Sequence, residues 1–178
     1  FDVIHNNSLH YLPVCMSDTV PAPMVTTLHT PPFCWLESGI RLGRGNMRYV
    51  AVSQATADMW RHVATARHVI PNGIDIPSTS SIDRDAMLAE FNIPPGAKVV
   101  GFVGRLARQK RVRDLIWSMQ LLRQLTDDVY FLIIGDGPER SRLEQLAQQL
   151  GCDDVTRFAG HRDDADKLIG LLNVFWLA

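Results

Sequence analysis

Short apolar runs alternate with longer segments of helical period along the chain, and this alternation restricts the fold more than any other feature of the sequence. Neighbouring parallel strands need a helical crossover between them, so the pattern predicts an α/β fold with parallel sheets. The strands fall into two groups of four, which predicts parts of two Rossmann-like domains. The predicted strands are residues 2–5, 24–28, 49–52, 68–70, 99–103, 130–134, 155–158 and 174–177.

The clearest helix predictions cover residues 111–125 and 138–150. Both segments carry apolar residues at steps of three and four, typical of a helix that lies against a sheet. The second has Pro138 in its first turn and Gly151 after its last. Residues 54–63 and a short capped segment, 81–91, predict further helices. Residues 8–17 stay open between helix and loop, because Pro13 interrupts helical hydrogen bonding.

Residues 71–81 mark a change of composition, since Pro, Gly, Asn, Ser and Thr cluster there and no apolar period survives. Such a stretch is typical of a domain boundary. We therefore predict that residues 1–76 are the C-terminal part of one domain and residues 77–178 the N-terminal part of a second. Each end of the chain interrupts a strand group, so we expect an internal piece of a longer protein.

Charge and hydropathy exclude several function classes. The net charge of −1 gives no basis for a nucleic-acid partner, which would need a strongly basic face. The apolar runs are far shorter than the ~20 residues of a membrane span, and no secretory leader is evident. We expect a cytoplasmic protein. The three cysteines have no metal-ligand spacing, so we expect packing roles for them and no metal site.

A basic loop follows the strand at residues 99–103. Five of the eighteen Lys and Arg residues lie between positions 105 and 113, where the chain enters a helix. Cations near a helix N-terminus oppose the helix dipole, so their clustering suggests an anionic ligand, most naturally a phosphate. The candidate binding segment is residues 104–113. The alternative is a solvated basic loop.

Three other features lie at strand ends. Gly135 and Gly137 allow a tight turn or a close backbone approach to a ligand, although Arg140 replaces the third glycine of a dinucleotide fingerprint. The alternative is an ordinary strand-to-helix turn. His29 ends a strand before Pro31, where it would face an inter-domain crevice, with a loop or core histidine as the alternative. The acidic residues Asp163, Asp164 and Asp166 favour first-turn helix charge over a metal site.

The order of these segments resembles the retaining GT-B glycosyltransferases of the family 4-like kind, also called glycosyl transferases group 1. Residues 1–5, 27–30, 50–53 and 69–75 are similar to the first domain and hinge of that family. Residues 103–106 with Lys110, followed by 132–138 and 155–160, are similar to its second domain.

The resemblance implies a hexosyltransferase of class EC 2.4 that uses a nucleotide-sugar donor, retains configuration and needs neither metal nor cofactor. Arg105 and Lys110 would hold the donor pyrophosphate, with Gly104, Gly135 and Gly137 in the donor site. His29 would be catalytic, beside the transferred sugar, after closure about the hinge. The acceptor is an unknown lipid, glycan or small molecule, and peripheral membrane contact is compatible with the resemblance.

Two departures from the family pattern matter. Arg111 stands where the family usually has glycine after the lysine. The Glu-x7-Glu segment, which supplies an essential carboxylate, would begin past Ala178, so we expect the chain alone to be inactive. A nucleotide-binding or inactive homologue and a nucleotide-sugar epimerase remain alternative functions.

Overall fold

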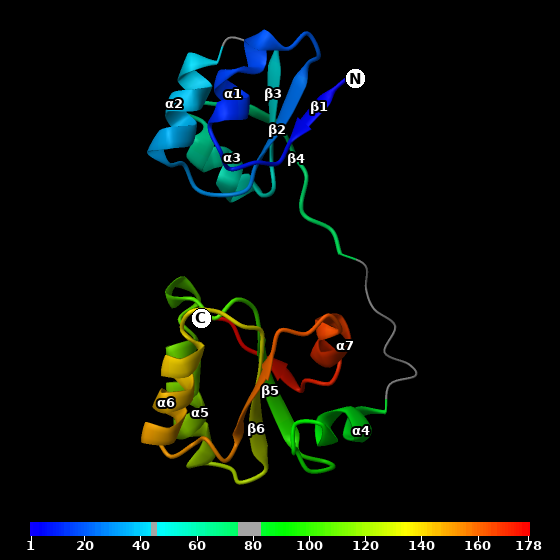
Figure 1. Ribbon diagram of the computed structural model, residues 1–178, viewed down its shortest axis with the longest axis vertical. Helices are drawn as coiled ribbons and strands as arrows, with labels where there is room; N and C mark the ends of the chain where they lie inside the picture. Colours follow the sequence, from blue (N-terminus) through cyan, green and yellow to red (C-terminus); the bar gives the residue numbers. More distant parts are fainter. Residues whose placement is uncertain (44–45, 75–82) are drawn as a thin grey trace. The chain divides into compact units, whose positions relative to one another are not determined.

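The computed structural model describes residues 1–43, 46–74 and 83–178, and the chain divides into two compact units, Phe1–Asp75 and Ile76–Ala178 (Figure 1). The boundary predicted after residue 76 lies outside the described residues. The elements of the first unit are β1 (Ile4–Asn6), α1 (Leu12–Cys15), η1 (Ser17–Thr19), β2 (Met24–Leu28), α2 (Cys34–Leu42), β3 (Met47–Ala51), α3 (Gln54–Trp60) and β4 (Ala66–Val69).

The first unit is a parallel sheet in the order β1-β2-β3-β4. Each new strand is added on the same side of the previous one, and right-handed crossovers then place every connecting helix on one face. Figure 1 shows α1, α2 and α3 on one side of the strands. Strand β2 alternates accordingly, with Met24, Thr26 and Leu28 buried and the residues between them half-buried.

Trp60 anchors this helical layer. Its side chain is fully buried at the end of α3, in a cluster with Leu28 and Leu36. The indole Nε1 donates a hydrogen bond of 2.7 Å to the carbonyl oxygen of Thr30. The core is thereby tied to the loop that follows β2, the same loop that carries His29.

The second unit consists of α4 (Arg84–Ala89), β5 (Lys98–Val103), η2 (Arg108–Lys110), α5 (Val112–Arg123), β6 (Val129–Ile134), α6 (Arg140–Gln149), β7 (Thr156–Gly160), α7 (Ala165–Ile169) and β8 (Val174–Phe175). Its parallel sheet has the order β7-β6-β5-β8. The chain moves outward from β5 to β7 and then returns to the other edge of β5. This reversal puts α5 and α6 on one face and α4 and α7 on the other (Figure 1).

Two apolar clusters hold the second unit together. Phe102, Ile116 and Phe131 belong to the cluster under α5 and α6, while Leu132 and Leu168 belong to the cluster under α4 and α7. Because β6 is covered on both faces, its residues form the continuous apolar run expected of a central parallel strand. The two parallel sheets confirm the predicted α/β fold.

Several element predictions need correction. Helix α2 is not apparent from the sequence pattern. Helix α6 begins at Arg140 instead of Pro138, because residues 138–139 form a turn in which Glu139 donates its backbone N–H to the carbonyl oxygen of Leu106. Residues 8–17 form only α1 and η1, with Pro13 in the first turn of α1, where proline is tolerated. The packing role fits buried Cys152 but is wrong for the exposed Cys34.

We predict that Trp60→Ala lowers the free energy of unfolding by about 3 to 5 kcal/mol, since it removes a fully buried indole. Trp60→Phe should cost less, because it keeps most of the apolar volume and loses only the hydrogen bond to Thr30. Urea denaturation followed by circular dichroism measures both. The control is Trp35→Ala, whose side chain is 68% exposed, and an equal loss in that variant would contradict the assigned role of Trp60.

Candidate functional site

The carboxyl ends of three neighbouring strands form a pocket of about 440 Å³ in the second unit. Each strand contributes the residues at and just after its end. These lining residues are Val103, Gly104 and Arg105 after β5, Ile134, Gly135 and Asp136 after β6, and His161, Arg162 and Ala165 after β7. Ligands of open parallel sheets bind at this edge, so the pocket is the candidate site.

Backbone contacts close the floor of the pocket. Gly104 donates its N–H to Ile134 at 2.9 Å, and Gly135 donates to Gly160 at 2.7 Å. A Cβ atom on Gly135 would lie 2.0 Å from the carbonyl oxygen of Gly104, and Gly135 has a φ of +132°. Glycine is therefore required at position 135 by the neighbouring strand end as well as by backbone conformation.

Gly137 has a similar packing role but does not line the pocket. A Cβ atom there would lie 2.4 Å from the carbonyl oxygen of Leu106. Leu106 donates its N–H to Asp136 at 2.9 Å and accepts from the N–H of Glu139 at 3.0 Å. The loops after β5 and β6 are thus joined backbone to backbone, and Gly137 permits the close approach.

Arg105 is exposed and lines the pocket, next to Gly104 and Gly135. Lys110 is also exposed, but it ends η2 and does not line the pocket. Neither side chain forms an ion pair or hydrogen bond within residues 1–43, 46–74 and 83–178. The structure therefore brings together three of the five predicted donor-binding residues, with both cations available to a ligand.

Arg111 has a left-handed backbone, with φ 48° and ψ 30°, immediately before α5. This conformation explains why glycine would suit the position, since it costs any other residue roughly 1 kcal/mol or more. The Arg111 guanidinium pairs with Asp114, in the first turn of the helix, at 2.6 Å. Asp114 also supplies the negative charge that the helix N-terminus favours, so part of the basic loop is neutralised within the protein.

Asp136 is held in its ionised form. The backbone N–H of Gly137 donates to its carboxylate at 2.7 Å, and Arg140 donates at 3.1 Å. These two contacts lower the pKa of Asp136. Arg140 also pairs with Glu144 at 2.9 Å, which raises the pKa of the guanidinium. The pocket consequently has a fixed negative charge opposite the exposed Arg105.

His161 and Arg162 line the pocket but were not predicted as site residues. Arg162 donates two hydrogen bonds of 2.8 Å to Asp164, which lower the pKa of that carboxyl group, and its guanidinium lies 5.6 Å from the ring centroid of Phe91. His161 is exposed, with Asp163 3.5 Å away. Their position directly after β7 is the signal that could have identified them. Asp163 and Asp164 thus form ion pairs with these two residues, and Asp166 lies in the first turn of α7.

His29 belongs to a different pocket, of about 460 Å³, in the first unit. It lies just past β2 on the face of the sheet away from the helices, with Val25 and Thr27. Its Nε2 is 3.2 Å from Oδ1 of Asn7, which follows β1. Oδ1 can only accept, so this contact suits the tautomer that carries its proton on Nε2 and has Nδ1 as an acceptor.

Within the described ranges, no group of three or more His, Cys, Asp or Glu side chains is arranged to hold a metal ion. The described helices are all too short or too polar to cross a lipid bilayer.

Comparisons with known proteins cover both units. Residues 83–178 match the family described as Glycosyl transferases group 1, and residues 1–77 match Glycosyltransferase Family 4. The lipopolysaccharide core biosynthesis glycosyltransferase LpsE of Rhizobium meliloti (strain 1021) is 34% identical over 107 residues, which are 60% of this chain and 29% of LpsE.

A longer match, at lower identity, is to the 2-deoxystreptamine N-acetyl-D-glucosaminyltransferase of Streptomyces fradiae. It is 26% identical over 167 residues, covering 82% of this chain and 40% of that enzyme. The chain therefore spans less than half the length of these curated relatives.

Among solved structures, Anabaena Alr3699/HepE in complex with UDP has a TM-score of 0.79 and 24% identity, covering 98% of this chain and 52% of that one. The same protein in complex with UDP-glucose has a TM-score of 0.76 and 23% identity over the same shares. This similarity confirms the predicted GT-B fold of the two units.

We predict that Gly135→Ala destabilises the second unit by about 3 to 5 kcal/mol, because strain at positive φ and overpacking against Gly104 add together. The control is Gly151→Ala, where φ is +64° but nothing lies within 4 Å of the new Cβ. That variant should lose only about 1 kcal/mol. Urea denaturation measures both, and similar losses would show that the contact with Gly104 is unimportant.

Arg111→Gly should be more stable than Arg111→Ala by about 1 kcal/mol, because only glycine adopts the left-handed conformation without strain. Both variants lose the exposed ion pair with Asp114, so the difference between them isolates the backbone term. Thermal unfolding of the two variants provides the measurement. Equal stabilities would mean that position 111 is not left-handed in solution.

Proposed function

The chain belongs to the glycosyl transferases group 1 family, and from this premise we propose that the protein transfers a sugar from a nucleotide-sugar donor to an acceptor. In this proposal the second unit is the donor-binding domain and the first unit is the acceptor-side domain. The acceptor is a hydroxyl group of a lipid, glycan or small molecule, and transfer retains configuration without a metal ion.

One observation carries the proposal beyond family membership. Arg105 follows β5 directly, is exposed, and lines a pocket of about 440 Å³ at the carboxyl ends of three strands. Within the described ranges it has no acidic partner of its own, so its charge is available for a ligand. A guanidinium suits a diphosphate, because its planar fork donates paired hydrogen bonds to phosphate oxygens.

The proposed chemistry depends on charge. When the bond between the sugar and the diphosphate breaks, its electron pair stays with the diphosphate, which becomes more negative. Preplaced cations at Arg105 and Lys110 stabilise that charge more in the transition state than in the ground state, and this difference accelerates transfer. Gly104 and Gly135 line the same pocket as Arg105, while Gly137 permits the close approach of the loops after β5 and β6.

His29 is the residue that we propose to contact the transferred sugar. Its hydrogen bond with Asn7 fixes the ring, and the free Nδ1 can accept a hydrogen bond from a sugar hydroxyl. The donor class is supported by the solved structures of Anabaena Alr3699/HepE with UDP and UDP-glucose. The relatives that act in lipopolysaccharide core biosynthesis and on 2-deoxystreptamine support a glycan or cyclitol acceptor.

In the full-length protein, we predict that Arg105→Ala and Lys110→Ala each reduce turnover roughly 100- to 1000-fold, the typical effect of losing one preorganised charge contact. Both side chains are exposed, so thermal unfolding should be unchanged. The exposed Arg67→Ala, in the first unit, is the matched control. Transfer assays with radiolabelled nucleotide sugars provide the measurement, and wild-type rates in both variants would refute the assignment.

The same assay separates the alternatives. Turnover that persists in excess EDTA supports metal-independent transfer. Tight binding of UDP without transfer to any of a panel of acceptors would instead identify a nucleotide-binding homologue. Conversion of the nucleotide sugar into its epimer would identify an epimerase.

A further inference from the structure

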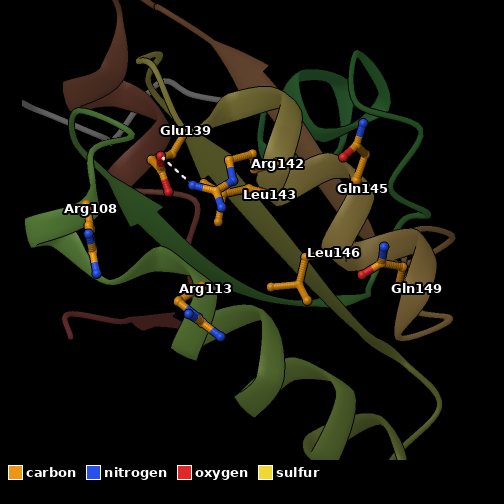
Figure 2. Close-up of a pocket in the computed structure, with 8 residues that line it drawn as sticks. All are labelled: Arg108, Arg113, Glu139, Arg142, Leu143, Gln145, Leu146 and Gln149. Atoms are coloured by element: carbon orange, nitrogen blue, oxygen red, sulfur yellow. Dashed lines mark ion pairs between the residues drawn. The ribbon is translucent and has the colours of Figure 1, made fainter.

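A second pocket of the second unit, of about 420 Å³, lies on the side of α5 and α6 (Figure 2). Arg108 comes from η2 and Arg113 from the first turn of α5, while the remaining lining residues belong to α6 and its N-cap, Glu139. Those residues are Glu139, Arg142, Leu143, Gln145, Leu146 and Gln149. None of the lining residues is shared with the pocket that contains Arg105.

Three arginines and a single carboxylate line this pocket. In the part of the chain that the structure describes, none of the three guanidinium groups donates a hydrogen bond to another protein group. Each guanidinium carries five N–H donors, so the pocket presents a dense array of unused donors with positive charge.

The acidic neighbours of these arginines are only weakly engaged with them. Arg113 lies 3.9 Å from one oxygen of Asp114, but the other oxygen of that carboxylate is held by Arg111 at 2.6 Å. Arg142 lies 3.5 Å from Glu139, the contact drawn in Figure 2. Both distances exceed that of a charge-assisted hydrogen bond. These two ion pairs therefore neutralise the charges of Arg113 and Arg142 only in part.

The four remaining residues that line the pocket are uncharged. Leu143 is buried and Leu146 half-buried, which gives the pocket an apolar floor, and the exposed Gln145 and Gln149 continue along α6. Glutamine amides donate and accept hydrogen bonds without charge, as hydroxyl-bearing ligands require. One end of the pocket thus suits an anion, and the other suits an uncharged polar group.

We propose that this pocket binds a small phosphate monoester that carries a polyol, such as a sugar phosphate. Guanidinium groups bind phosphate oxygens in bidentate fashion, the glutamines match the hydroxyl groups, and the volume is in the range of small-ligand sites. The site is separate from the donor pocket and does not depend on the proposed transferase function.

The test uses the full-length protein, titrated both without and with excess UDP, so that binding of glucose 6-phosphate in the pocket that contains Arg105 is distinguished from binding here. Isothermal titration with glucose 6-phosphate should show binding that weakens with added salt. Arg113→Gln combined with Arg142→Gln should weaken it by at least about tenfold, as expected for the loss of charged phosphate contacts. Arg41→Gln combined with Arg67→Gln makes the same charge change in the first unit and should have no effect.

Further titrations define the ligand class. Inorganic phosphate should bind more weakly than glucose 6-phosphate, and Gln145→Ala with Gln149→Ala should remove that difference. Glucose itself should not bind measurably. Melting temperatures of the free variants, which should match that of the wild type, confirm that they are folded.

Three outcomes would overturn the proposal. The first is no binding of glucose 6-phosphate, which would leave the arginines as a solvated surface. The second is equal weakening in the Arg113/Arg142 and Arg41/Arg67 variants, which would indicate a net-charge effect. The third is binding to phosphatidylglycerol vesicles that is lost in the Arg113/Arg142 variant while glucose 6-phosphate fails to bind, which would reassign the pocket to lipid headgroups.

Discussion

The close approach of two backbone segments, after β5 and after β6, determines the architecture of the candidate site. Gly104 and Leu106 each exchange a backbone hydrogen bond with the neighbouring segment, and Gly135 and Gly137 leave no side-chain atoms in the way. These contacts fix the direction in which the chain leaves β5, and therefore the position of Arg105. A side chain as mobile as arginine can contribute to a preorganised site only when its backbone is held in this way.

The second unit has a pocket at several consecutive strand ends that combines cations with glycines. Its lining comes from the ends of β5, β6 and β7, which are neighbours in the sheet order β7-β6-β5-β8, so their carboxyl ends lie at one edge. In the first sheet the strands follow in sequence, and the pocket that contains His29 lies across the face that α1, α2 and α3 leave uncovered. The pocket that contains His29 is lined by four aliphatic residues together with histidine, threonine and asparagine side chains.

Much of the fold could be predicted because periodicity reports burial directly. Strand β6 is apolar throughout since helices cover both of its faces, and α5 has one apolar stripe since one face packs on the sheet. Helix α2 was missed, because Trp35 and Leu42 are exposed apolar residues that blur its stripe. Gly104, Arg105 and Gly135 could be grouped in advance, since carboxyl ends of parallel strands share an edge.

Other parts of the site depend on tertiary contacts that no local pattern reveals. Whether Lys110 lines the pocket is decided by the turn of η2 and the left-handed Arg111, and neither follows from the spacing of charges. His161 and Arg162 follow β7, whose place beside β6 is known only from the sheet order. The function of Gly137 as a packing residue likewise requires the carbonyl of Leu106, which is distant in sequence.

The segment from Gly104 to Arg108 forms part of the wall of two pockets, with Arg105 in one and Arg108 in the other. Two residues, Leu106 and Ala107, separate them in the sequence, and the backbone of Leu106 is fixed by its hydrogen bonds with Asp136 and Glu139. A ligand that shifts this segment in one pocket would also shift the arginine that lines the other pocket. Where binding in one pocket shifts the segment, thermodynamic reciprocity requires each ligand to change the affinity of the other by the same factor.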